Sequence, residues 1–289
     1  MKTMHLLFFS IAFILASLLQ NSVRADGLPL YYYQEPKLAN FGDVLAYKIV
    51  EKIVGRPVEV AKHYYKGKKL LGLGSIFYFA REGDIIWASG INGKTLDKKY
   101  YTFENLDIRA VRGPLSRNFL MAYFNIYVPE VYGDPALLMP YLFPEFKRAK
   151  EPKYEYIVIP HYSEEHLFPR TEKDEHIVYP NDPWDVVVRK ILNSKLVISS
   201  SLHGIVVAEA YGIPARMLHF GETRHKFFFK YQDYYSGTGR YTFQYAISVE
   251  EAISMGGESP AICDVEKLYE AFPFEQWPET KFKKINWKR

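Results

Sequence analysis

Short apolar segments alternate with amphipathic ones along most of this chain, and this alternation restricts its fold more than any other feature. Runs such as 107–111, 156–159 and 196–199 have the length of buried strands. Between such runs, residues 44–54 repeat apolar side chains every three or four positions, which is the spacing of a helix packed on a sheet. Strands that alternate with helices predict parallel sheets with helices on both faces, so we expect an α/β protein.

The expected elements form two series. The predicted strands are 28–33, 69–73, 84–88, 107–111 and 130–132, followed by 156–159, 196–199 and 215–218. The predicted helices are 44–54, 114–123, a segment from about 183 to 192, and 205–211. Residues 144–153 are rich in charge and proline, which is typical of a boundary between lobes. We therefore expect an N-terminal Rossmann-like lobe over 26–148 and a C-terminal Rossmann-like lobe with a C-terminal helix over 149–289.

The first 25 residues have the pattern of a secretory signal peptide. Lys2 precedes an apolar run over residues 6–19, and Val23-Arg24-Ala25 supplies a small-residue cleavage site. The run is shorter than the roughly 20 residues that a membrane-spanning helix needs. We expect residues 1–25 to be a signal peptide, or else an uncleaved anchor that attaches the protein to a membrane through 6–19. Either interpretation predicts a location in the secretory pathway or outside the cytoplasm.

Charge and cysteine content exclude several classes of function. The formal net charge is +4 over 289 residues, which is too small to predict nucleic acid as a partner. A single cysteine, Cys263, excludes an intrachain disulfide and a cysteine-cluster zinc site. The eight histidines lack the spacing of metal ligands, so we expect no metal and no cofactor.

Glycine and polar residues gather where the predicted strands end. The sites are Asn40 and Asp43, Gly74 and Ser75, Arg112 and Arg117, Asp134, His161, and Ser201 with His203. Parallel strands bring such loops to one edge of a sheet, where helix N-termini and cationic side chains bind anions. None of the loops has a Walker or G-x-G-x-x-G fingerprint, so a nucleotide site is not indicated.

Each candidate also has a structural interpretation. His203 lies between an apolar strand and an apolar helix, and it is either a general acid or base or a histidine that packs at the helix start. His161 offers the same choice. Asp43 and Asp134 fit helix-start caps, and Arg112 fits an ion pair. Lys226 and Lys230, four residues apart, share one face of a helix that either holds an anion or is solvated.

Taken together, the loop motifs resemble the polysaccharide pyruvyl transferase family, in particular the ketal-pyruvate transferases of exopolysaccharide synthesis. The matching stretches are Asn40-Phe-Gly-Asp43, Gly72-Leu-Gly-Ser75, Ala110-Val-Arg-Gly-Pro-Leu-Ser-Arg117, Tyr132-Gly-Asp-Pro-Ala-Leu137, Ile159-Pro-His161, Ser200-Ser-Leu-His-Gly204, Glu209-Ala-Tyr-Gly-Ile-Pro214 and Lys230-Tyr-Gln-Asp-Tyr-Tyr235. They occur in family order over roughly residues 29–240. The resemblance implies two lobes similar to the GT-B glycosyltransferases, with the active site in the cleft between them.

The resemblance also implies an activity and its participants. Pyruvate would move from phosphoenolpyruvate, the co-substrate, onto hydroxyls of a glycan or lipid-linked oligosaccharide as a ketal, with release of phosphate. His203 matches the family's motif histidine and is the expected acid, while Arg112 and Arg117 match the arginine-bearing motif and are expected to bind the donor. Lys226 or Lys230 would hold phosphate or carboxylate. The remaining expected substrate-binding residues are Asn40, Asp43, Gly74, Ser75, His161 and Ser201.

One departure and two alternatives accompany this interpretation. Many family members have an arginine just ahead of the motif histidine, whereas this chain has Ser201-Leu202, so a cation has to come from elsewhere. A GT-B-like glycosyltransferase that uses a nucleotide sugar is one alternative function. A non-catalytic secreted protein that binds glycans on the same fold is the other, and fold alone does not separate the three.

Overall fold

The structure is a computed structural model, which describes residues 27–34, 40–170, 174–220, 225–282 and 284–287. The predicted signal or anchor segment, including residues 6–19, lies outside the described residues and stays a prediction. Within the described ranges, no helix has the length and apolar character that crossing a membrane requires.

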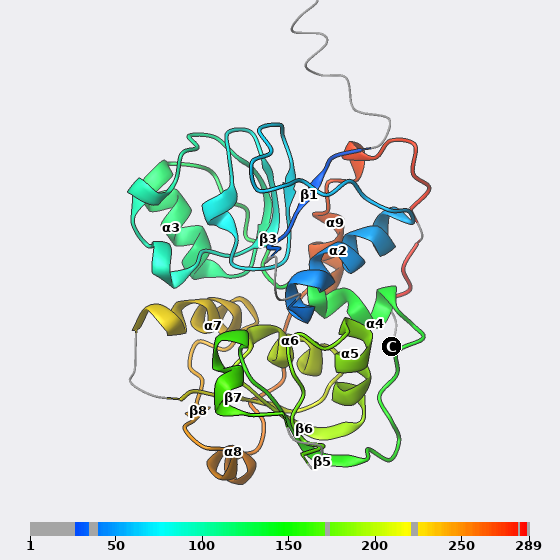
Figure 1. The fold of residues 1–289 in the computed structure, drawn as a ribbon. Helices are drawn as coiled ribbons and strands as arrows, with labels where there is room; N and C mark the ends of the chain where they lie inside the picture. The colour runs from blue at the N-terminus through cyan, green and yellow to red at the C-terminus, as the bar shows by residue number, and fades with distance from the viewer. Residues whose placement is uncertain (1–26, 35–39, 171–173, 221–224, 283, 288–289) are drawn as a thin grey trace, which may run out of the picture.

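Two parallel four-stranded sheets form the centres of two lobes (Figure 1). The first sheet has the order β1-β2-β3-β4, with β1 at Leu30–Tyr31, β2 at Leu70–Leu71, β3 at Ile85–Ser89 and β4 at Asp107–Val111. The second has the order β5-β6-β7-β8, with β5 at Tyr154–Ile159, β6 at Ser194–Ser199, β7 at Ala215–Leu218 and β8 at Tyr245–Ala246. The predicted α/β class with parallel sheets is confirmed, while the likeness to GT-B enzymes stays a prediction.

Burial explains why the central strands form. Every residue of β3 is buried, as expected of a parallel strand covered on both faces. The predicted strand 130–132 is wrong as a strand, because only Tyr132 forms a bridge, to Val111. At Gly133, which follows at once, φ is 136°, a left-handed value that only glycine adopts easily and that turns the chain out of the ladder.

The helices begin and end at residues suited to those positions. They are α2 (Phe41–Val54), α3 (Pro114–Phe124), α4 (Met139–Leu142), α5 (Trp184–Leu192), α6 (Leu202–Ala210), α7 (His225–Gly237), α8 (Val249–Met255) and α9 (Val265–Glu270). The 3₁₀ turns are η1 (Phe77–Phe79), η2 (Gly93–Thr95), η3 (Lys98–Tyr100), η4 (Pro135–Leu138), η5 (Tyr162–Leu167) and η6 (Phe274–Gln276). Helix α2 starts three residues earlier than predicted because the side chain of Asn40 accepts the Gly42 N–H at 3.1 Å and caps it.

Helix α2 joins the two lobes although it belongs to the first by sequence. Figure 1 shows it between the two sheets, beside α4 and α5. The Phe41 N–H donates to the carbonyl of Pro180 at 2.7 Å, and the buried face of α2 belongs to one continuous core with residues of both lobes. This placement fixes the N-terminus of α2 near the loops of the second sheet.

The C-terminal segment packs against the first lobe. The indole N–H of Trp87 donates to the carbonyl of Leu268 in α9 at 2.9 Å, and Phe272 lies edge-on to the same indole. Figure 1 shows α9 beside the first sheet. The predicted second lobe, 149–289, therefore contains a final helix whose contacts lie in the other lobe.

Candidate active site

The turn after β6 places His203 at the start of α6. The Ser199 hydroxyl donates to the Ile159 carbonyl at 2.8 Å and accepts the Ser201 N–H at 3.0 Å, which tightens the turn. Helix α6 then begins at Leu202, three residues earlier than predicted. A Cβ on Gly204 would lie 2.4 Å from the Ser199 hydroxyl, so this close turn requires glycine.

His203 is buried between α2 and η4. Its exposed fraction is 9%, and a Cβ on Gly42 would lie 2.2 Å from the imidazole Nδ1. On the other side of the ring, Nε2 lies 3.8 Å from Oδ2 of Asp134. Within the described part of the chain, Nε2 is buried without a hydrogen-bond partner. The glycine in Asn40-Phe-Gly-Asp43 therefore makes room for the histidine of another motif.

Cations surround the two histidines. Burial, followed by the charges of Lys230 and Arg112, lowers the pKa of His203 to about 3. Burial also lowers the pKa of His161 to about 3, with smaller effects of Lys230, Lys94 and His203 in that order. Both imidazoles are therefore neutral at neutral pH. The charges that oppose their protonation come from α7, from η2 and from the end of β4.

Lys230 itself is destabilised as a cation. Burial, followed by the charge of Arg112, lowers its pKa to about 8, and Lys94 lowers it further, while Glu164 and Asp43 act in the opposite direction. Glu164 lies in η5 and Asp43 in the first turn of α2, so the charged groups near Lys230 come from both lobes. An anion placed among these cations would relieve their mutual repulsion.

Arg112 joins the lobes through its guanidinium, which is 1% exposed. Its Nε donates to Asp233 of α7 at 3.1 Å, Nη1 to the Ser75 hydroxyl at 2.6 Å, and Nη2 to the Ile91 carbonyl at 2.9 Å. A Cβ on Gly90 would lie 2.2 Å from the guanidinium carbon, so the pocket that holds Arg112 is closed. Arg112 thus contacts protein partners in this arrangement, and its expected role in donor binding stays a prediction.

The other predicted residues take supporting positions around this cluster. Asn40 caps α2, and the Gly74 carbonyl accepts the Gly90 N–H at 2.9 Å. The His161 N–H donates to the Ser200 hydroxyl at 2.8 Å, and its Nδ1 lies 2.7 Å from the Ser163 hydroxyl. Ser201 is buried ahead of α6, and its side chain makes no capping hydrogen bond there.

Of two further predicted residues, Arg117 lies away from the cluster and the side chain of Lys226 is not described. Arg117 donates to the Val128 carbonyl at 3.0 Å and forms an ion pair with Glu130 at 3.2 Å, and these partners follow α3 in the first lobe. The side chain of Arg117 thus lies with partners of the first lobe, and its predicted donor role stays a prediction. The side chain of Lys226 lies outside the described residues, so its predicted role stays a prediction.

Two charged residues near the cluster, Lys94 and Glu164, were not expected from the sequence, and Asp134 has a second role besides the expected cap. Asp134 caps η4 as expected, because its Oδ1 accepts the Ala136 N–H at 2.9 Å. Its second oxygen, Oδ2, faces His203. Burial raises the pKa of Asp134 to about 6, against the effects of Ala136 and Arg112. Lys94 and Glu164 stand in no motif. The position of Lys94 in a loop after a strand is the one signal that could have found it.

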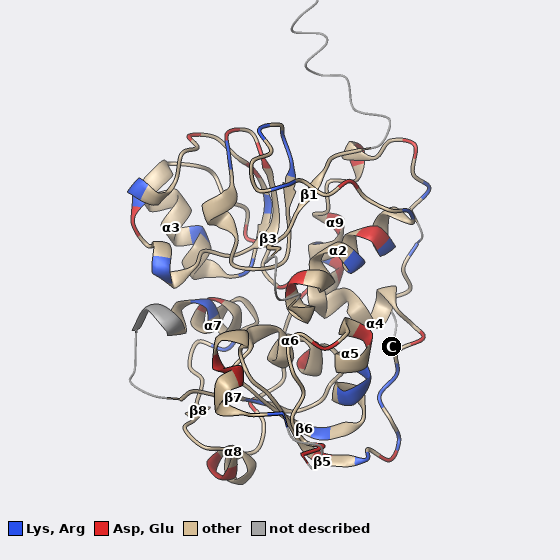
Figure 2. Ribbon diagram, in the orientation of Figure 1, with Lys and Arg blue, Asp and Glu red and all other residues tan. Residues whose placement is uncertain are grey.

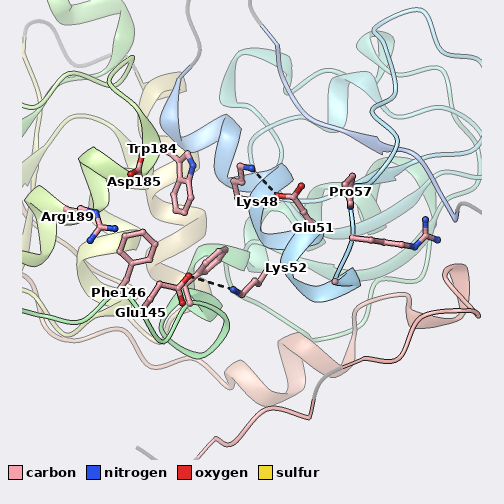
Figure 3. A pocket seen from close by; sticks show the side chains of 12 residues that line it. Lys48, Glu51, Lys52, Pro57, Glu145, Phe146, Trp184, Asp185 and Arg189 are labelled. Carbon is pink, nitrogen blue, oxygen red and sulfur yellow. Dashed lines mark hydrogen bonds and ion pairs between the residues drawn. The ribbon is translucent and has the colours of Figure 1, made fainter.

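A surface groove lies elsewhere and holds none of the predicted site residues. It has a volume of about 580 Å³ and follows the C-terminal half of α2 (Figure 3). The lining residues are Lys48, Glu51, Lys52, Gly55, Arg56, Pro57, Phe143, Glu145, Phe146, Trp184, Asp185 and Arg189. Figure 3 shows its charges pairing with each other, Lys48 with Glu51 at 3.0 Å and Lys52 with Glu145 at 3.7 Å. Four of the charged side chains that line the groove are therefore engaged with each other.

The described residues contain no group of three or more His, Cys, Asp or Glu side chains placed to hold a metal ion. Lys, Arg, Asp and Glu alternate over both lobes (Figure 2). The expectations of no metal, no cofactor and no nucleic-acid partner stay predictions.

Comparison with known proteins gives a family match and two relatives. The family model described as polysaccharide pyruvyl transferase matches residues 40–218. The uncharacterised protein L143 of Acanthamoeba polyphaga mimivirus is 30% identical over 159 residues, 53% of each chain. The succinoglycan biosynthesis protein ExoV of Rhizobium meliloti (strain 1021) is 29% identical over 197 residues, which are 63% of this chain and 57% of that protein. The chain thus spans little more than half the length of these curated relatives.

A crystal structure of a functionally uncharacterised protein from Klebsiella pneumoniae is similar at a TM-score of 0.43 and 12% identity, over 77% of this chain and 92% of that one. The family match includes the motifs that carry Gly42, Arg112, Asp134 and His203, and it covers more than half of the chain. This chain therefore belongs to the polysaccharide pyruvyl transferase family.

Proposed function

We propose that this protein transfers pyruvate from phosphoenolpyruvate to two hydroxyls of a glycan, which forms a cyclic ketal and releases phosphate. The observation that carries the proposal is a neutral, buried His203 among cations that come from both lobes. Phosphoenolpyruvate carries a phosphate and a carboxylate, and it matches such a cluster in charge. ExoV, a relative, is named for succinoglycan biosynthesis, which agrees with a glycan acceptor.

Different residues of the cluster would supply the charge and the hydrogen bonds that the donor needs. Lys230 and Lys94 supply positive charge, and His161 supplies a neutral imidazole whose one N–H can donate to the anion. Since this chain has Ser201 ahead of the motif histidine, Lys230 and Lys94 take the place of the missing arginine cation. Arg112 adds a fixed charge behind them and holds α7 in place.

The reaction needs one proton donor near neutral pH. In the free protein, the charges of Lys230 and Arg112 oppose protonation of His203. A bound phosphate and carboxylate would compensate these charges and raise the pKa of His203, so the imidazole becomes protonated as the donor binds. It then gives its proton to the methylene carbon of the enol, one hydroxyl adds to the neighbouring carbon, and a second hydroxyl displaces phosphate there. The hydroxyl protons pass to the released phosphate and back to His203.

The test is phosphate release from phosphoenolpyruvate by the purified protein with a panel of β-galactosides and other hexosides. We expect release that depends on an acceptor, and we expect His203→Ala to lower it by at least about a hundredfold, the usual contribution of a general acid. The variant His166→Ala, at an exposed histidine of η5, is the matched control and should keep full activity.

Absence of release with every acceptor, together with no thermal stabilisation by phosphoenolpyruvate, would contradict the proposal. Stabilisation by a nucleotide sugar in that case would favour the glycosyltransferase alternative. Glycan binding that survives His203→Ala without turnover would favour a binding protein.

A further inference from the structure

The imidazole of His203 is fixed between a glycine and a carboxylate. Gly42 lies against Nδ1, and even one added carbon on Gly42 would overlap the ring at 2.2 Å from that atom. Asp134 lies on the other side, with Oδ2 at 3.8 Å from Nε2. Both residues that form this pair are buried, with exposed fractions of 9% for His203 and 1% for Asp134. The ring therefore cannot turn away from the carboxylate without displacing α2.

Asp134 is held rigidly by its own neighbours. Its Oδ1 accepts the Ala136 N–H at 2.9 Å, which leaves Oδ2 to face the imidazole. The preceding Gly133 donates its N–H to the Arg112 carbonyl at 3.2 Å, and a Cβ there would lie 2.8 Å from the Cys263 sulfur. Both carboxylate oxygens thus have fixed directions, one toward the turn of η4 and one toward His203.

At 3.8 Å the Nε2 atom and the carboxylate oxygen are too far apart for a hydrogen bond, so the carboxylate acts on the Nε2 proton through its charge. Among the described residues, Nε2 has no hydrogen-bond partner, and a buried polar atom without one is costly. A buried carboxylate beside an imidazole selects the tautomer whose proton points at it, and it stabilises the imidazolium when one forms.

We propose that Asp134 is a positioning residue, which keeps the proton of neutral His203 on Nε2 and stabilises the imidazolium when His203 is protonated. The catalytic part of this inference rests on the proposed function. The tautomer part concerns the free protein and does not depend on any substrate. Several charged or titratable groups act on His203 or its neighbours. They are Asp134 before η4, Asp43 from α2, Lys230 from α7, Arg112 after β4, His161 after β5, Lys94 from η2 and Glu164 from η5.

The test uses the full chain labelled with ¹⁵N-histidine, in which the His203 signals are assigned by their loss in His203→Ala. In the wild-type protein at neutral pH we expect a protonated Nε2 and an unprotonated Nδ1. In Asp134→Asn the side-chain carbonyl can still accept the Ala136 N–H, but the carboxylate is gone. We expect the Nδ1–H tautomer to appear in that variant and kcat to fall by about a hundredfold, with KM for phosphoenolpyruvate changed less than threefold.

Asp97 supplies a matched control, because it also caps a 3₁₀ turn by accepting the N–H two residues on, at 3.0 Å from Lys99 N. The variant Asp97→Asn should leave the His203 signals and kcat unchanged. If Asp134→Asn does not fold, Asp134→Ser keeps an oxygen for the cap and replaces it in the same measurement. A His203 proton on Nδ1 in the wild-type protein, or an unchanged tautomer in Asp134→Asn, would overturn the inference.

The two proposals fail in different ways. If wild-type protein releases no phosphate from phosphoenolpyruvate but shows the Nε2–H tautomer that Asp134→Asn loses, the proposed function fails and the positioning of His203 stands. If wild-type turnover depends on His203 but Asp134→Asn leaves both the tautomer and kcat unchanged, the function stands and the inference about Asp134 fails.

Discussion

At the scale of single residues, the charge of Lys230 changes with pH near the neutral range. Its lowered pKa, about 8, means that the ammonium is present below that pH and is lost as pH rises through it. The cause is burial first and Arg112 second, and neither depends on a ligand. If Lys230 holds the donor, its protonation state controls how strongly the free protein attracts an anion.

We therefore predict that phosphoenolpyruvate affinity falls as pH rises through about 8. Lys230→Gln should remove this step and weaken binding by about tenfold to a hundredfold at pH 7, since it removes a charge-assisted hydrogen bond. Calorimetric titrations at several pH values would measure both effects, with Lys66→Gln, at an exposed lysine, as the control. An affinity that stays constant across pH 8 would exclude Lys230 from the donor site.

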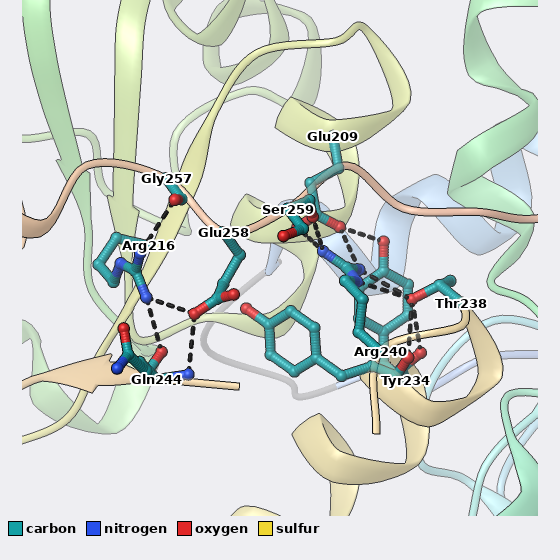
Figure 4. Close-up of polar contacts among 10 residues, drawn as sticks. Glu209, Arg216, Tyr234, Thr238, Arg240, Gln244, Gly257, Glu258 and Ser259 are labelled. Carbon is teal, nitrogen blue, oxygen red and sulfur yellow. Dashed lines mark hydrogen bonds and ion pairs between the residues drawn. The ribbon is translucent and has the colours of Figure 1, made fainter. Parts of the chain in front are cut away.

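At the scale of elements, α6 is tied to α7 and to the segment after it by a buried ion pair (Figure 4). Arg240 donates to both carboxylate oxygens of Glu209 at 2.6 and 2.8 Å, and the Tyr234 hydroxyl donates to the same carboxylate at 2.7 Å. The two charged side chains are 6% and 5% exposed. Figure 4 also shows Arg216 bonded to Glu258, which anchors β7. Glu209, in the matched motif 209–214, thus has a structural partner.

Replacing Glu209 with glutamine should strongly destabilise the protein, because it leaves the buried Arg240 without a counter-charge. Loss of one partner of a buried ion pair costs about 3–5 kcal/mol. Urea denaturation followed by circular dichroism would measure the change. Glu175→Gln, at an exposed pair with Lys153 at 2.7 Å, is the control and should change stability by less than about 1 kcal/mol. Equal effects of the two variants would refute the buried role of Glu209.

At the scale of the whole molecule, α7 connects the two lobes through its contacts with α3. Although α7 follows β7 of the second sheet, its Asp233 accepts the Ser116 N–H at 2.9 Å and the Ser116 hydroxyl at 2.6 Å in α3. The backbone contact is equally close, because a Cβ on Gly113 would lie 1.8 Å from the Asp233 carbonyl oxygen. The same helix carries Lys230, so lobe packing and donor-site charge depend on one element.

The variant Gly113→Ala should separate α7 from the first lobe. Backbone strain is not the cause, since φ at Gly113 is −168°, an extended value open to any residue. Overpacking of this kind costs about 1–3 kcal/mol, and displacement of Lys230 should weaken phosphoenolpyruvate binding as well. Thermal unfolding with and without the donor measures both. The control is Gly72→Ala, where the nearest contact of an added Cβ is an ordinary 3.7 Å. Unchanged donor binding in Gly113→Ala would contradict the coupling.

The sequence by itself determined the local elements, because their causes are local. Apolar runs of strand length gave 107–111 and 215–218 with the bounds that the structure has, and Pro114 and Gly55 mark a helix start and a helix end. The order of the loop motifs indicated the family, and the match to its motif histidine predicted His203 as the central residue. Gly42 and Gly204 are visible in the sequence motifs. The side chains that they make room for, those of His203 and Ser199, are visible only in the structure.

Tertiary structure alone decided which groups meet, because burial and charge compensation arise between segments far apart in the chain. Arg112 and Asp233 are separated by 121 residues, and their pairing makes Arg112 a bridge between the lobes, which its motif does not indicate. The placement of α9 on the first lobe and the approach of Asp134 to His203 have the same origin. Local patterns fix a side chain's position along a strand or helix, whereas its pKa and its partners depend on the elements that fold against it.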